Sequence, residues 1–138
     1  MRTLALAFFF FSFLLSVSPP AAAAGAQPRK TEHPSNVALL EQPGRWVYVH
    51  FPSNLRLYVY GKDQPGKSAC NVGCESAWPP LTPDEMDAKP VGDWTVIARA
   101  NGKKQWAYKN QPVYLRFHDS MEKPIGDGID GVWRFLEP

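Results

Sequence analysis

Residues 55–81 constrain the fold more than any other part of the chain, because they combine a β pattern with both cysteines. The stretch opens with Leu-Arg-Leu-Tyr-Val-Tyr, and such alternation is typical of a strand with one face buried. A Pro-Gly pair then predicts a turn, and Cys70 and Cys74 follow a few residues later. We therefore expect a small β-rich domain that is anchored around this stretch.

The N-terminus has the pattern of a secretory signal peptide. Met1-Arg2 precedes an apolar run from Leu4 to Val17, and small residues continue to Ala24. The order of a basic start, an apolar core and a small-residue exit is that of a signal peptide, and the run is shorter than the about 20 apolar residues that span a bilayer. We expect residues 1–24 to be removed, with no transmembrane segment left after cleavage and a periplasmic or secreted location.

The rest of the chain divides into a leader and one domain. Residues 25–44 are rich in proline and polar residues, which predicts an extended leader that attaches through one apolar patch. Residues 45–138 are long enough for a single β-rich domain but few for a large core. Basic and acidic residues are interspersed, with a net charge of +2 for the whole chain, so no basic stripe indicates a nucleic-acid partner.

The two cysteines have one structural and two chemical interpretations. In an oxidising compartment a disulfide is the default fate of an even number of cysteines, and closing so short a ring stabilises a fold by about 2 kcal/mol. Alternatively, Cys70 and Cys74 are redox-active thiols, or they bind copper together with His118 or His50. A zinc site would require a second close pair of ligands, which the sequence does not contain.

The remaining β pattern predicts a mainly β fold of about six short strands, with helical turns only near residues 71–77 and 83–86. An Asn101-Gly102 pair joins two of these strands, and Asn-Gly between β runs is a strong hairpin signal. The strands are expected at residues 46–51, 55–60, 94–100, 105–108, 113–117 and 132–136.

An internal duplication is also visible, so the strands should form two related halves. Tyr58 and Asp63 recur as Tyr114 and Asp119 at the same spacing. The other proposed correspondences are Trp46 and Tyr48 with Trp106 and Tyr108, Gly66 with Gly126, and Trp94 with Trp133. This alignment treats residues 67–92, which carry both cysteines, as an irregular disulfide-bearing insertion in the first half.

The residues of this stretch resemble a bacterial family of secreted repeats and predicted lipoproteins. Its motif, Tyr-x-aromatic-x-x-Asp, is matched by Tyr58, Tyr60 and Asp63, and Tyr114 to Asp119 form a second copy. The similarity extends to Cys70, Cys74, the Trp-Pro-Pro-Leu run from Trp78, and Trp94. Arg116 replaces the second aromatic residue, and no lipobox cysteine is present, so a membrane anchor is not implied. The family has no settled activity, so the resemblance implies a fold and a location.

The motif aspartates and the aromatic residues each have two interpretations. Asp63 and Asp119 either fix turns by accepting backbone hydrogen bonds, or they converge as in a glycosidase or a calcium site. The rings either form the core, or some line one sheet face and stack on a carbohydrate or another flat ligand. The ring candidates for such a face are Trp46, Tyr48, Trp78 and Trp106.

No catalytic signature is present in the sequence. It has no Gly-x-Ser-x-Gly elbow and no glycine loop that would cradle a phosphate. The sequence therefore favours a non-catalytic exported structural or binding module, stapled by Cys70 and Cys74, with no cofactor. Its partner would be an unknown envelope protein or a small ligand. The alternatives are a periplasmic redox or copper-binding protein and a carbohydrate-binding module.

Overall fold

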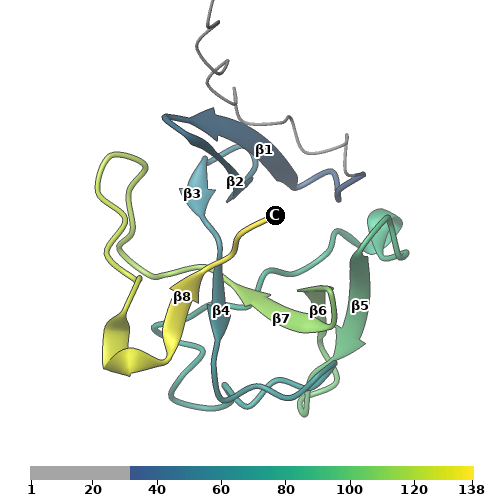
Figure 1. Ribbon diagram of the computed structural model, residues 1–138. Helices are drawn as coiled ribbons and strands as arrows, with labels where there is room; N and C mark the ends of the chain where they lie inside the picture. The colour runs from purple at the N-terminus through teal and green to yellow at the C-terminus, as the bar shows by residue number, and fades with distance from the viewer. Residues whose placement is uncertain (1–31) are drawn as a thin grey trace, which may run out of the picture.

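The computed structural model describes residues 32–138, and these residues form a mainly β domain of two antiparallel sheets (Figure 1). One sheet has the order β1-β2-β3 and the other has the order β5-β6-β7-β4-β8. The strands are β1 (Val37–Gln42), β2 (Arg45–His50), β3 (Leu55–Arg56), β4 (Tyr58–Tyr60), β5 (Trp94–Ala98), β6 (Lys104–Tyr108), β7 (Gln111–Tyr114) and β8 (Trp133–Phe135). Two short 3-10 turns, η1 (Glu85–Asp87) and η2 (Ile129–Gly131), are the helical elements of this region. The mainly β prediction is confirmed.

The N-terminal predictions are only partly within this region. The expected signal peptide, residues 1–24, lies outside the described residues, as does the start of the leader. None of the helices formed by residues 32–138 has the length and apolar character needed to span a membrane.

The folded sheet begins earlier than the sequence pattern indicated, at Val37 rather than Arg45. Strand β1 pairs antiparallel with β2 along its whole length, and Val37 is buried. The short apolar run of this segment supplies a strand face, and Gly44, at φ +79°, allows the tight turn into β2. The second half of the expected leader is therefore an edge strand.

The strand predicted at residues 55–60 is divided at Leu57. Residues before this point pair with β2 in the first sheet, and residues after it pair with β7 and β8 in the second. Leu57 itself is fully buried, and its carbonyl accepts a hydrogen bond from Leu136 N–H (2.8 Å). One continuous alternating run thus connects the two sheets.

The structure confirms two related halves and shows that they are interlocked. Residues 37–81 and 94–136 follow the same course, and the last segment of each half pairs with the tyrosine strand of the other. Leu81 N–H donates to Val113 O (2.9 Å), just as Leu136 N–H donates to Leu57 O. Phe117 N–H to Ala77 O (3.0 Å) and Gly61 N–H to Val132 O (2.7 Å) form a second matching pair. We call these halves the first repeat and the second repeat.

These hydrogen bonds correct the alignment at the cysteine segment. Trp133 is equivalent to Trp78, not to Trp94, because each follows the residue, Val132 or Ala77, whose carbonyl accepts from the other repeat. Gly126 is equivalent to Cys70, not to Gly66, because the N–H groups of the preceding residues, Ile125 and Ala69, make the same hydrogen bond to Asp119 and Asp63. The cysteine-bearing residues up to Trp78 are therefore the counterpart of the loop before Trp133. They are not an insertion that the second repeat lacks.

A second correction concerns the first hairpin of each repeat. Val49 lies opposite Arg56, and Ala107 lies opposite Pro112, which makes Tyr48 equivalent to Trp106. The predicted match of Tyr48 with Tyr108 is wrong. Its cause is loop length, because residues 51–54 connect the first hairpin whereas Lys109 and Asn110 alone connect the second, both at positive φ.

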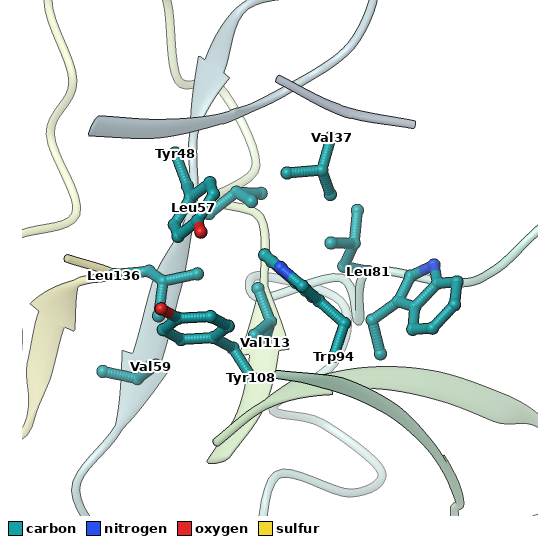
Figure 2. Close-up of a cluster of buried hydrophobic side chains, with 10 residues drawn as sticks. Val37, Tyr48, Leu57, Val59, Leu81, Trp94, Tyr108, Val113 and Leu136 are labelled. Carbon is teal, nitrogen blue, oxygen red and sulfur yellow. The ribbon is translucent and has the colours of Figure 1, made fainter. Parts of the chain in front are cut away.

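The core has two clusters on opposite sides of β4 and β7. Side chains alternate across a strand, so Leu57, Val59 and Val113 enter one cluster while Tyr58 and Tyr114 enter the other. Figure 2 shows the first cluster, in which Tyr48 from one sheet faces Trp94 and Tyr108 from the other. The second cluster is formed by Tyr58, Cys70, Trp78, Tyr114 and Trp133.

Candidate functional site

The two motif copies are joined by crossed hydrogen bonds between tyrosine and aspartate. The Tyr58 hydroxyl donates to Asp119 Oδ2 (2.7 Å), and the Tyr114 hydroxyl donates to Asp63 Oδ2 (2.8 Å). Each tyrosine thus bonds to the aspartate of the other repeat. The two tyrosines lie directly opposite each other on β4 and β7. This pairing places the hydroxyl of each tyrosine beside the loop that follows the tyrosine strand of the other repeat.

The second oxygen of each motif carboxylate fixes the loop that follows it. Asp63 Oδ1 accepts from Ala69 N–H, and Asp119 Oδ1 accepts from Ile125 N–H, both at 2.7 Å. The turn-fixing interpretation of these aspartates is therefore the one that the structure supports. The backbone donor lies six residues on in both cases, whereas aspartate in an ordinary Asx turn bonds about two residues on.

Burial shapes the ionisation of this network. Burial and the hydrogen bond to Asp119 raise the pKa of the Tyr58 phenol far above its ordinary value. Burial is also the main cause of the raised pKa of Tyr114, and it raises the pKa of Asp63 despite the donors from Ala69 and Tyr114. Both tyrosines therefore stay protonated at neutral pH and act as hydrogen-bond donors.

An aromatic column runs beside this network and also crosses between the repeats. Trp78 and Trp133 stack with centroids 3.6 Å apart and planes 5° apart. Tyr60 stacks on the Trp133 side (4.3 Å), and the Arg116 guanidinium lies over Trp78 (4.7 Å). Since Tyr60 and Arg116 occupy equivalent positions, the arginine replaces the motif's aromatic residue by a cation–π contact at the other end of the column.

The disulfide of the sequence prediction is present in the structure. Cys70 and Cys74 are joined with their Cα atoms 5.2 Å apart, within the usual range for disulfides. Cys74 N–H and Glu75 N–H both donate to Asn71 O, which closes a helix-like turn. With both sulfur atoms in this bond, the thiolates that a copper or redox interpretation needs are absent from this form of the protein.

Arg99 holds the disulfide turn against the hairpin of the second repeat, and sequence analysis missed it. Its buried guanidinium donates to Ser68 Oγ (3.1 Å), to Glu75 Oε2 (2.9 Å) and also to Gln105 Oε1 and Cys70 O. Ser68 Oγ is in turn hydrogen bonded to the Tyr114 hydroxyl (2.8 Å). Gln105 was the available signal, because a polar residue at an inward position of a predicted strand requires a buried partner.

Three of the rings proposed for a ligand-stacking face are buried. Tyr48, Trp78 and Trp106 have at most 5% of their surface exposed, so their role is packing. Trp46 is half-buried on β2, opposite Glu41. The structure therefore does not bring these four residues together on one exposed face.

The two histidines proposed as metal ligands are in different settings. His50 Nδ1 is hydrogen bonded to Ser53 Oγ (2.7 Å), and burial lowers its pKa. His118 is exposed at φ +64°, with its ring 4.1 Å from that of Phe117. Within residues 32–138, no three His, Cys, Asp or Glu side chains form a group that could hold a metal ion.

Surface hollows lie beside the disulfide turn and away from the tyrosine–aspartate network. Three hollows, of about 560, 530 and 200 Å³, are connected by shared lining residues such as Glu75, Thr82 and Lys103. Neither the motif tyrosines nor the motif aspartates line them. The motif residues therefore serve the interior of the fold and are not the walls of these clefts.

Comparison with known proteins gives one family. A family model matches residues 95–137. It describes a secreted repeat of unknown function. The matched span coincides with the second repeat seen in the structure, and it contains Tyr114 and Asp119. The resemblance drawn from the sequence is thereby confirmed over that span, and together with the disulfide it indicates an exported module. No curated protein and no solved structure matches the chain.

Proposed function

We propose that this protein is a non-catalytic exported module of the cell envelope, in which the motif residues and the disulfide stabilise a rigid pair of repeats that presents a binding surface. The observation that carries the proposal is the crossed tyrosine–aspartate network. Both oxygens of Asp63 and both oxygens of Asp119 accept hydrogen bonds from within the fold. These groups therefore have a complete structural role.

The same geometry argues against a catalytic role for the motif. A general acid or base must come within hydrogen-bond reach of a substrate, yet Tyr58 and Tyr114 are fully buried. Two glycosidase carboxylates would need free oxygens on either side of a sugar, whereas each motif carboxylate binds a tyrosine and a backbone N–H. A non-catalytic role, in which the surface binds an envelope protein or a small ligand, therefore fits this geometry better than catalysis does.

Export has independent support from chemistry. The secreted-repeat match and the disulfide both favour an oxidising compartment, and we propose the periplasm as that compartment. The Cys70–Cys74 disulfide closes a short ring, so its expected contribution to the free energy of unfolding is about 2 kcal/mol. Arg99 adds a second fixation of the same turn through Cys70 O and Glu75.

Thiol counting on exported protein tests this proposal against the redox and copper alternative. Protein isolated from the periplasm or the medium is denatured and titrated with and without reductant. We expect no free thiols before reduction and two afterwards, and a disulfide that persists in a glutathione buffer at the potential of an oxidising compartment. The double variant Cys70→Ser/Cys74→Ser should fold with stability lowered by about 2 kcal/mol. Free thiols in exported protein, together with stoichiometric copper binding, would reject the structural role.

A further inference from the structure

The loop after β7 carries an unusual concentration of exposed apolar side chains. Phe117, Met121 and Ile125 are 56%, 54% and 42% exposed, and they make up half of the large apolar side chains that are exposed in residues 32–138. In Figure 1 this yellow-green loop extends away from the sheets between β7 and β8. Several exposed large apolar side chains in one segment mark a candidate interaction site.

The first repeat provides an internal control for this loop. Its loop is fixed in the same way, by an aspartate oxygen that accepts from a backbone N–H at 2.7 Å. At the positions equivalent to Phe117, Met121 and Ile125 it carries Gly61, Pro65 and Ala69. The fold of the loop therefore does not require large apolar side chains there, and their exposure calls for a reason outside the fold.

The second-repeat loop is also held in a defined conformation. Asp119 fixes its base through Tyr58 and Ile125, and Lys123 N–H donates to Ser120 Oγ (3.1 Å) at its tip. A surface that is ordered before binding loses less conformational entropy when a partner docks.

The charges at the tip are complementary to those of a second copy of this chain. Glu122 and Lys123 are adjacent and exposed, and neither forms an ion pair with another residue of the described chain. Opposite charges side by side are self-complementary about a twofold axis, since Glu122 of each copy can face Lys123 of the other. An anionic membrane would instead repel Glu122 as much as it attracts Lys123.

We propose that the second-repeat loop is a self-association surface, through which two copies of this chain dock patch to patch about a twofold axis. The inference rests on the proposed function as a binding module, for which it names the partner. A fully buried aromatic side chain covers about 150–250 Å² and an aliphatic one less, so these three half-exposed side chains offer at most about 300 Å² per copy. Stable complexes bury about 1,200–2,000 Å² in total, which makes this dimer weak and reversible.

The first experiment is sedimentation velocity of the exported protein at concentrations from about 10 μM to about 1 mM, where weak association is measurable. We expect the wild type to shift from monomer to dimer across this range. The variant Phe117→Gly/Met121→Pro/Ile125→Ala, which copies the first repeat, should stay monomeric. The same triple variant with Met121→Ala in place of Met121→Pro controls for a change of the backbone caused by proline. The control Val72→Ala/Met86→Ala, which removes exposed apolar side chains elsewhere, should dimerise like the wild type.

The second experiment reverses the charges. Glu122→Lys or Lys123→Glu alone places like charges in contact across the axis and should raise the dissociation constant about tenfold. The double variant Glu122→Lys/Lys123→Glu restores complementarity and should recover the wild-type dissociation constant. Binding to a different partner would not be restored by this exchange of charges.

The inference fails if the wild type is monomeric at every concentration, or if the double variant dimerises no more strongly than the single variants. Binding of monomeric protein to phosphatidylglycerol vesicles would overturn it in favour of a membrane. The loop variants should leave the thiol count of the same samples unchanged, so failure here leaves the proposed function as an exported module standing, and free thiols would reject that function separately.

Discussion

Removal of a single hydroxyl group from the tyrosine–aspartate network should destabilise the whole domain. In Tyr58→Phe the fold loses the hydrogen bond to Asp119 and the one accepted from Gly126 N–H (3.2 Å). Tyr114→Phe loses the bonds to Asp63 and Ser68. A hydrogen bond to a charged group contributes about 1.5–3 kcal/mol and a neutral one about 1 kcal/mol. We therefore expect each variant to lose about 2–4 kcal/mol.

Tyr60→Phe is the matched control for this prediction. Tyr60 belongs to the same strand and the same motif, but its hydroxyl makes no hydrogen bond within residues 32–138, and its ring is only half-buried. Its loss should cost less than about 0.5 kcal/mol, as for most surface changes. The comparison therefore separates the hydroxyl's contribution from that of the ring.

Equilibrium unfolding in urea, followed by tryptophan fluorescence, measures the three variants. For a domain of this size the m value, the loss of unfolding free energy per molar urea, is about 2 kcal/mol per molar, so the midpoints of Tyr58→Phe and Tyr114→Phe should fall by about 1–2 M. If both stay within about 0.5 kcal/mol of the wild type, the crossed hydrogen bonds do not hold the repeats together, and the structural role of the motif is refuted.

Three further predictions follow from the network and its surroundings. Because burial raises the folded-state pKa of Tyr58 and Tyr114 above the unfolded value of about 10, stability that is complete below that pH should fall as the pH rises above it. Alkaline unfolding followed by phenolate absorbance checks this, and equal slopes in wild type and Tyr58→Phe would contradict it. Arg99→Ala should lower the free energy of unfolding by about 3–5 kcal/mol, because it leaves Glu75 unpaired and the buried acceptors without a donor. Exposed Lys104→Ala is the control and should have no effect. Equal stability of the two variants in urea unfolding would refute the role of Arg99 in holding the disulfide turn. Gly126→Ala would place Cβ 2.5 Å from the Tyr58 ring and should lower the free energy of unfolding by about 3 kcal/mol or more. A melting temperature as high as that of Gly61→Ala would contradict the close packing.

The sequence predicted those parts of the fold that depend on local pattern. Alternation located the strands around Trp106 and Tyr114, and export chemistry predicted the Cys70–Cys74 bond. Strand β1 was not predicted, because the prolines and polar residues around Val37 have the composition of a leader. Its pairing with β2 is a tertiary contact that composition does not record.

The register of the repeats was harder to predict than their existence. The identical spacing of Tyr58 to Asp63 and Tyr114 to Asp119 revealed the duplication. However, the first hairpin turn is longer in the first repeat, and similarity of aromatic residues then favoured the wrong match for Tyr48. Only the hydrogen bonds between Leu81 and Val113, and between Leu136 and Leu57, show that the last segment of each repeat pairs with the tyrosine strand of the other.

The crossing of the motif partners could not be derived from sequence spacing. Within one repeat Tyr58 and Asp63 are close in the chain, and spacing alone suggests that they belong together. The partners are exchanged because β4 and β7 pair antiparallel with Tyr58 opposite Tyr114, which directs each ring toward the other loop. Arg99 was missed for a similar reason, since its acceptors come from two segments, residues 68–75 and Gln105, that are far from each other in the sequence.

Nuclear magnetic resonance of the tyrosine hydroxyl protons tests most directly whether the motif joins the two repeats. Buried, hydrogen-bonded hydroxyls exchange slowly with water, so the account predicts two protected hydroxyl signals, assigned to Tyr58 and Tyr114. The Tyr58 proton should show a nuclear Overhauser effect to the amide of Gly126 in the other repeat. Rapid exchange of both hydroxyls, or contacts of the Tyr58 proton with the Asp63 loop of its own repeat, would contradict the account.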